Sequence, residues 1–246
     1  MNLFYAPDIL TCPELPEDEA VHALRVLRMT VGDTLTVTDG RGTLYQARLS
    51  AISGRHCTVS ITGAQPQPPL WRGHLHLAIA PTKNMDRMEW LMEKATEIGI
   101  DEITFLCCRY SERRVVKTDR IRRVAVAAMK QSLKARLPQV NEMTDFDPFI
   151  TQPHGGQCFI AHCQPGPKPH LLASLDADRD AVVLIGPEGD FSPEEVAQAV
   201  AHGYQPISLG PSRLRTETAA LVACHLMALT HQTGLRPSGL QPRLPN

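Results

Sequence analysis

The stretch AVVLIGPEGDFSPEEV, residues 181–196, combines a buried strand, a glycine-rich loop and a helix start. Five apolar residues, 181–185, are followed at once by Gly-Pro-Glu-Gly at 186–189. Ser192 and Glu195 then occupy the N-cap and N3 positions of a predicted helix, and together they form a capping box. This order predicts that the chain leaves the carboxyl end of a strand, turns sharply and enters a helix at a fixed angle.

The same alternation of strand and helix continues through the C-terminal two thirds of the chain. Asp86 is expected to cap the first helix of this region, and Gly99 to close it. Apolar strands that alternate with helices indicate an α/β fold with a parallel sheet covered on both faces. Strands are expected at 74–80, 103–108, 157–162, 181–185 and 206–209, and later helices at about 118–136, 168–175, 193–202 and 217–232.

The first 63 residues have a different pattern. After a short helix at about 17–27, apolar and polar residues alternate, with turns at Asp39-Gly40 and Ser53-Gly54. AQPQPPL, residues 64–70, has three prolines and is typical of a linker. We therefore expect a small β domain at 1–68 and an α/β domain at 69–246.

Basic residues are concentrated in residues 109–136, which contain ten Lys or Arg against two acidic residues. That segment carries a charge of +8, while the other residues, with 15 basic and 24 acidic side chains, carry −9. A solvated helix face is the ordinary meaning of such a stripe, but its density favours a polyanion, RNA or DNA, as partner. The expected contacts are Arg25 and Arg28 on the small domain and Arg109, Arg113, Arg114, Arg120, Arg123, Lys130 and Lys134 on the large one.

Several classes of protein are disfavoured by the composition. No apolar run of about 18 residues and no signal-peptide pattern occurs, so we expect a cytoplasmic protein without a membrane segment. Seven cysteines form no Cys-x-x-Cys pair and ten histidines form no ligand-spaced cluster, so reduced thiols and no metal are expected. Neither the P-loop pattern nor Gly-x-Gly-x-x-Gly is present, which argues against a nucleotide-dependent enzyme with a phosphate loop.

Ligands of parallel α/β sheets bind outside the carboxyl ends of the strands. Three such ends fall late in the chain, at 161–163, 185–189 and 209–217. Glu188 in the second of these loops would repel an anion, so a neutral or cationic ligand fits better.

The third loop, SRLRTETA, places two arginines and Glu217 at the entrance of an apolar helix, with Thr216 as its expected cap. One interpretation is capping with a surface salt bridge. The functional interpretation is that Arg213 or Arg215 faces a substrate anion, while Glu217 orients the arginine or accepts a proton.

Two blocks resemble a known signature. GPEGDFSPEE (186–195), followed shortly by LGPSRLRTETAAL (209–221), is similar to the bacterial 16S ribosomal RNA uracil-N3 methyltransferases of the SPOUT superfamily. HALRVLRMTVGDTLTVTDGRG (22–42) resembles that family's PUA-like β-barrel, which binds RNA. The blocks at 83–100 and 111–138 are also similar, so the likeness covers most of the chain. Asp190 stands where the family commonly has glycine.

The resemblance implies S-adenosylmethionine as methyl donor, bound by three loops of a C-terminal trefoil knot. It also implies a homodimer that acts on 16S RNA of the small ribosomal subunit. The methylated N3 atom must lose a proton, and Arg215 is expected to stabilise the resulting charge on the uracil oxygens, with Glu217 as base or arginine-orienter. The donor positions carried over are His162, Gly186, Pro187, Glu188, Gly189, Leu209, Gly210, Leu214 and Thr216.

Two alternatives remain at this point. One is another SPOUT enzyme that methylates a different base or a transfer RNA. The HALRVLRM and RLRTETA blocks favour the uracil-N3 family over it. The other is a non-catalytic RNA-binding assembly factor with a relict pocket, which the intact GPEG and RLRTE loops disfavour.

Overall fold

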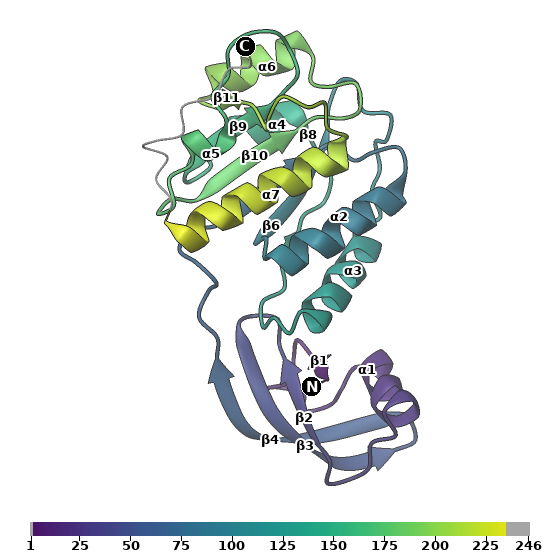
Figure 1. Ribbon diagram of the computed structural model, residues 1–246. Coiled ribbons are helices and arrows are strands. Elements are labelled where there is room, and N and C mark those ends of the chain that lie inside the picture. The colour runs from purple at the N-terminus through teal and green to yellow at the C-terminus, as the bar shows by residue number, and fades with distance from the viewer. Residues whose placement is uncertain (1, 235–246) are drawn as a thin grey trace. The chain divides into compact units, whose positions relative to one another are not determined.

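The computed structural model describes residues 2–234 of the 246-residue chain. These residues form two compact units (Figure 1). One comprises the residues up to Pro69 together with Ala125–Leu137, and the other comprises Leu70–Val124 and the residues from Pro138 onward. The sequence did not indicate that residues 125–137 pack with the N-terminal unit.

The first unit is built on a four-stranded sheet in the order β1-β2-β3-β4. β1 pairs parallel with β2, and the remaining pairs are antiparallel. The expected turn at Ser53-Gly54 is present as the tight connection between β3 and β4, with Gly54 at a φ of 62°. The elements are β1 (Leu3–Tyr5), α1 (Glu17–Val21), the π-helical turn η1 (His22–Val26), β2 (Thr34–Thr38), β3 (Thr43–Ser53) and β4 (His56–Pro66).

Two expectations about the first unit were wrong in their boundaries. β4 continues to Pro66, so the first three residues of the expected linker are strand; a proline is tolerated there because β4 is at the edge of the sheet. The basic helix α3 (Thr118–Gln131) ends before residue 136 because Leu133 adopts a φ of 55°. Ala135 then accepts hydrogen bonds from Gly42 N and Thr38 Oγ1, at 2.9 and 3.1 Å, which fix this segment on the small sheet.

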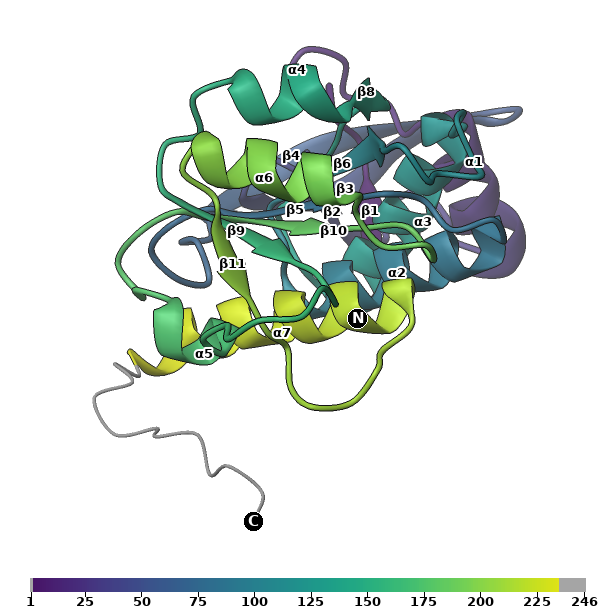
Figure 2. The same cartoon turned by 90° about the horizontal axis from the view of Figure 1, so that it is seen from above.

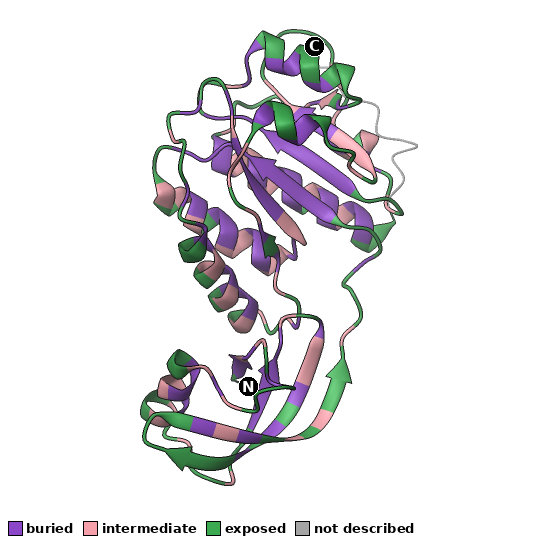
Figure 3. Cartoon of the chain, turned by 180° about the vertical axis from the view of Figure 1, so that it is seen from behind, coloured by how far each residue is buried: buried purple, intermediate pink, exposed green. Residues whose placement is uncertain are grey.

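The second unit contains the expected parallel sheet, in the order β11-β9-β10-β5-β6-β7, with β8 also paired to β6. Every pairing in it is parallel. The central strands are buried along their length (Figure 3). The strands are β5 (Leu75–Ile79), β6 (Glu102–Cys107), β7 (Gln139–Val140), β8 (Thr144–Asp145), β9 (Gln157–Ala161), β10 (Ala181–Ile185) and β11 (Gln205–Ile207).

Helices cover both faces of this sheet (Figure 2). α2 (Met85–Ile98), α5 (Leu171–Ser174) and α7 (Thr216–Thr233) lie on one face, and α4 (Phe146–Thr151) and α6 (Pro193–Ala201) lie on the other. Phe146, Phe191 and Val196 belong to the buried cluster beneath α4 and α6. The sequence did not predict α4, which has a proline inside a single short turn.

The helix ends follow the expected chemistry with two corrections. In α6, Ser192 Oγ accepts from Glu195 N and Glu195 Oε2 accepts from Ser192 N, so the capping box is confirmed. α2 is capped by the side chain of Asn84 and not by Asp86, whose own N–H donates to it. α7 begins at Thr216, which is already helical, and its N-cap is the extended Arg215 without a side-chain cap.

Within residues 2–234, every helix is too short or too polar to cross a bilayer. In the same range no group of three or more His, Cys, Asp or Glu side chains could hold a metal ion. All seven cysteines are free thiols.

Candidate functional site

The carboxyl ends of β9, β10 and β11 open into one cavity of roughly 1110 Å³. The three strands are parallel neighbours in the sheet, so the loops that follow them meet at one edge. These three loops supply most of the wall, with Arg87 of α2 and Lys168 added to it. All of the expected donor-binding residues line this cavity: His162, Gly186, Pro187, Glu188, Gly189, Leu209, Gly210, Leu214 and Thr216.

The loop after β10 is held tightly against its own helix. A Cβ atom on Gly186 would lie 3.0 Å from the Phe191 ring and 3.1 Å from the Phe191 backbone nitrogen, so a larger residue would force Phe191 to shift. Glu188 Oε1 accepts a hydrogen bond of 2.9 Å from the backbone N–H of Lys83. The exposed carboxylate therefore ties this loop to the loop after β5.

Asp190 completes the same loop at a φ of 67°, a conformation that aspartate tolerates better than most residues. Its backbone N–H donates to the carbonyl of Pro187 at 2.9 Å, and its carboxylate accepts from the backbone of Cys163. The substitution that departs from the family pattern therefore fits the backbone here.

His162 lines the cavity, and its two ring nitrogens are unpaired within residues 2–234. Both ring nitrogens are inaccessible to solvent and have no hydrogen-bond partner among the described residues. Burial and the charge of Lys168 lower the pKa of the imidazole, and Asp190 partly opposes them. The imidazole at the cavity wall therefore keeps one donor and one acceptor atom unused.

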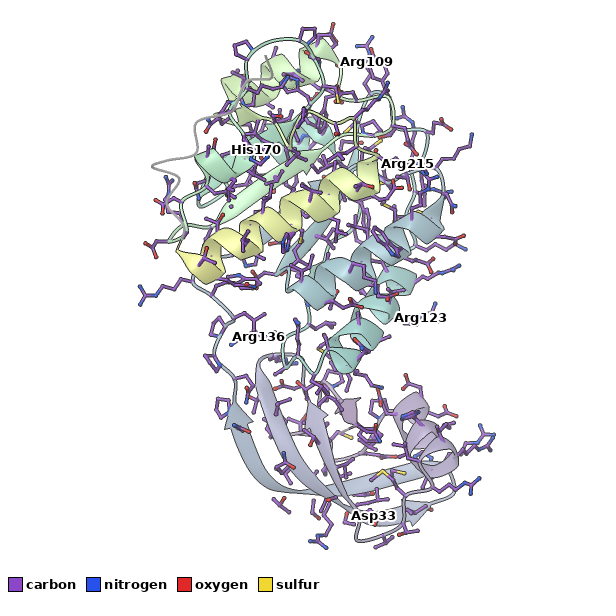
Figure 4. The ribbon with its side chains drawn as sticks, viewed as in Figure 1. Asp33, Arg109, Arg123, Arg136, His170 and Arg215 are labelled. Carbon is purple, nitrogen blue, oxygen red and sulfur yellow. The ribbon has the colours of Figure 1, made fainter. Side chains whose placement is uncertain are left out.

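Glu217, near the start of α7, is a buried acid at the cavity wall, with 7% of its surface exposed. Its Oε1 lies 3.5 Å from Nη1 of Arg87, and its Oε2 is buried without a partner in the described chain. The interpretation of Glu217 as part of a surface salt bridge is therefore wrong, because the carboxylate is buried and its partner belongs to α2. Arg213 and Arg215 are exposed at the cavity, with Arg215 at the N-terminal end of α7 (Figure 4).

Some of the predicted RNA contacts are exposed, and others already bind a neighbouring group in the protein. In the second unit, Arg109 and Arg114 are exposed on the segment that follows β6, and Arg113 Nη2 donates to the Lys83 carbonyl at 2.6 Å. Arg120 pairs with Glu89 at 2.6 Å, while Arg123 is exposed (Figure 4).

In the first unit, Arg25 and Arg28 are exposed, and Arg28 has a φ of 55°. Lys130 is paired with the buried Glu19. The prediction that Lys134 continues the helical stripe was wrong, because α3 ends three residues before it.

Sequence reasoning missed Arg87 and Lys168 at the cavity. Arg87 lies three residues after the N-cap of α2, and its pairing with Glu217 joins positions far apart in the chain. Only the similarity of the block at 83–100 to the family could have drawn attention to it.

Known proteins that are similar to this chain are described as RNA methyltransferases. A family model described as an RNA methyltransferase domain matches residues 69–228, and one described as an RNA methyltransferase PUA domain matches residues 15–62. The chain is 30% identical over 209 residues to a Synechocystis protein named ribosomal RNA small subunit methyltransferase E, covering 81% of this chain and 67% of that one.

Two crystal structures are similar over nearly the whole chain. A protein from Porphyromonas gingivalis described as a probable rRNA-methyltransferase is 44% identical, with a TM-score of 0.87 over 94% of this chain and 98% of its own. A ribosomal RNA small subunit methyltransferase E from Neisseria gonorrhoeae, bound to S-adenosyl methionine, is 26% identical, with a TM-score of 0.81 over 93% and 97%.

Proposed function

Because the chain belongs to the family of RNA methyltransferases, we propose that it uses S-adenosylmethionine to methylate N3 of one uridine in 16S ribosomal RNA. The similar proteins named small subunit methyltransferases support the RNA class, and the resemblance of the GPEG and RLRTE loops supports the base and atom. The observation that carries the proposal is the buried Glu217 carboxylate at the wall of a cavity formed by three strand-end loops.

The cavity suits a largely neutral nucleoside that carries a sulfonium. Leu209 and Leu214 supply apolar surface, the His162 ring has unused polar atoms, and the glycines let backbone amides come close. Glu188 would disfavour a phosphate but not a cation. When bound, the donor supplies an electrophilic methyl group.

The residues at the start of α7 then have separate tasks. Uracil N3 carries a proton between two carbonyl groups, and that proton must leave as the N–CH3 bond forms. The Glu217 carboxylate accepts it, and Arg87 orients that carboxylate through its Oε1 atom. Arg215, exposed at the cavity, stabilises the negative charge that develops on a uracil oxygen.

The target uridine must be unpaired, because N3 lies on its pairing edge. We propose that domain 1–68 binds the RNA through Arg25 and Arg28. The domain at 69–246 binds it through Arg109, Arg113, Arg114, Arg120 and Arg123. We also propose a cytoplasmic homodimer whose C-terminal domain contains the trefoil knot. Light scattering of the purified protein tests the dimer, since a monomeric mass at micromolar concentration would exclude it.

The test of the function is methyl transfer from labelled donor to small ribosomal subunits that lack the modification, beside naked 16S RNA. We expect label in RNA and 3-methyluridine as the product nucleoside by mass spectrometry. If a different base were methylated, the chain would instead be a SPOUT enzyme with a different target base. Failure to bind the donor in calorimetry would indicate a non-catalytic assembly factor.

A further inference from the structure

An aromatic side chain is fixed beside the cavity by the turn that follows β6. The backbone N–H of Cys108 donates to Ser111 Oγ at 3.0 Å, and the N–H of Ser111 donates back to the Cys108 carbonyl at 3.1 Å. Cys108 and Ser111 are buried, whereas Tyr110 between them is 48% exposed. The turn is therefore anchored on both sides, and it presents the phenol ring to solvent.

Tyr110 packs against the loop that supplies the donor site. A Cβ atom on Gly189 would lie 3.1 Å from Cβ and 3.7 Å from Cγ of Tyr110. Gly189 lines the cavity, but Tyr110 itself does not. Tyr110 therefore lies against the cavity wall at Gly189 without being part of the cavity lining.

The position of Tyr110 is tied to the same helix start that shapes the loop. The backbone N–H of Arg109 donates to Glu195 Oε1 at 2.8 Å, while Glu195 Oε2 completes the capping box of α6. One buried carboxylate thus connects the tyrosine turn to Ser192 at the start of α6, three residues after the GPEG loop. Such anchoring places the ring before any substrate arrives, which lowers the entropic cost of a stacking contact.

Charged groups around Tyr110 complete the chemistry of a nucleotide contact. Arg109 and Arg114 are exposed on the same short segment. The Arg113 guanidinium donates a hydrogen bond to the Lys83 carbonyl, and the backbone N–H of Lys83 donates to the Glu188 carboxylate. Exposed aromatic rings next to arginines are how proteins hold unpaired nucleotides, because the base stacks on the ring and the arginines meet the phosphates.

We propose that Tyr110 is a stacking platform for the base next to the target uridine, with Arg109 and Arg114 on the neighbouring phosphates. The base is the neighbour, and not the target, because Tyr110 lies outside the cavity in which the target is modified. This proposal rests on the proposed function. It adds a residue that reads the RNA strand at the mouth of the site.

The test compares Tyr110→Ala and Tyr110→Leu with Tyr110→Phe. Leucine keeps apolar packing on Gly189 but has no flat ring, and phenylalanine keeps the ring without the hydroxyl. We expect Ala and Leu to raise KM for the RNA and the Kd for an unpaired RNA oligonucleotide by about tenfold. Phe should behave as wild type, and all three should bind S-adenosylmethionine normally.

The salt dependence separates stacking from charge. Tyr110→Leu should weaken RNA binding equally at all salt concentrations, whereas Arg109→Ala should reduce the slope of log K against log salt. Unchanged RNA binding in Ala and Leu would overturn the proposal. So would an equal loss in Phe, which would assign the effect to the hydroxyl, or a loss of donor binding, which would assign it to support of the loop.

The RNA-binding arm keeps this test separate from the proposed function. If the wild-type chain transferred no methyl group, the proposed function would fall. A tenfold loss of oligonucleotide affinity in Tyr110→Leu would still support the platform, and its absence would still refute it.

Discussion

Asp190 Oδ2 accepts a hydrogen bond of 2.8 Å from the backbone N–H of Cys163. This bond joins the loop after β10 to the loop after β9, and both loops line the cavity. The carboxylate thus fixes the spacing of two walls, at the cost of a positive φ that a glycine would adopt without strain.

The affinity of Asp190 variants for the donor should therefore depend on two properties. These are whether the new residue keeps the hydrogen bond to Cys163 and whether it tolerates the positive φ. Asp190→Asn keeps an oxygen acceptor and should bind S-adenosylmethionine as the wild type does. Asp190→Gly loses the bond but relieves the backbone, while Asp190→Ala loses the bond and keeps the strain. We expect roughly a tenfold weaker Kd for Ala, corresponding to one lost hydrogen bond of about 1.4 kcal/mol, with Gly between. Calorimetry with equal affinity for Ala and Asn would contradict this.

The ion pair between Lys130 and Glu19 should matter for stability more than for RNA binding. Glu19 is only 4% exposed, so Lys130→Met leaves a buried carboxylate without its partner. We expect a loss of roughly 3 kcal/mol in the free energy of unfolding by urea, which the double variant with Glu19→Met should largely restore.

Lys117→Met, at an exposed position, is the matched control for that stability loss. In RNA binding, Arg123→Ala should reduce the salt slope more than Lys130→Met does. The reverse order, with an unchanged unfolding free energy in Lys130→Met, would place Lys130 in the RNA interface instead.

The buried His76 should make the second unit sensitive to acid. Burial lowers its pKa to about 4, against about 6.5 in an unfolded chain. Between these values the unfolded chain binds more protons than the folded chain. The contribution of His76 to the free energy of unfolding is therefore fully present above pH 6.5, and it falls by at most about 3 kcal/mol as the pH drops toward 4.

Neighbouring groups act differently on this pH dependence. The hydrogen bond with Glu102 raises the pKa of His74, so its contribution has the opposite sign and is lost as pH rises. That bond also lowers the pKa of Glu102 to about 2, so the contribution of Glu102 to stability is lost mainly as the pH falls below about 4.5. His76→Gln should flatten the fall in unfolding free energy between pH 6.5 and 4, and His225→Gln, at an exposed site, is its control. An unchanged slope in His76→Gln would remove His76 as the cause.

The strands and the helix starts with local signals could be predicted from the sequence. β10 matches its predicted bounds because five apolar residues are closed by a glycine, and the capping box of α6 is written in neighbouring residues. A parallel sheet also placed the three loops at the same edge, but their convergence depends on the neighbouring order of β11, β9 and β10, which the sequence did not indicate.

The remaining features depend on contacts between distant residues. The end of α3 is set by Leu133 at positive φ, a position where no glycine marks a stop. The short β7 and β8 form because they pair with β6, and α4 forms because its apolar side chains pack into the buried cluster beneath α4 and α6. Arg87 was missed for the same reason, because nothing in its local sequence points to Glu217.

Substitution of Arg87 distinguishes its positioning role from the proton-accepting role of Glu217. Arg87→Met leaves the acid in place without its positioning partner, so methyl transfer should fall by about tenfold while donor Kd changes little. Arg72→Met, at an exposed position outside the cavity and outside the proposed RNA contacts, is the control for loss of a positive charge. A wild-type rate in Arg87→Met would show that the carboxylate needs no partner.

The most direct measurement of proton removal in the cavity is single-turnover methyl transfer by Glu217→Gln, at saturating donor and RNA. Glutamine keeps the shape of the side chain but is a far weaker base. If Glu217 accepts the N3 proton, the rate should fall by at least about 100-fold while the Kd for S-adenosylmethionine stays within about twofold. A rate equal to that of the wild type, with 3-methyluridine still as the product, would contradict this role.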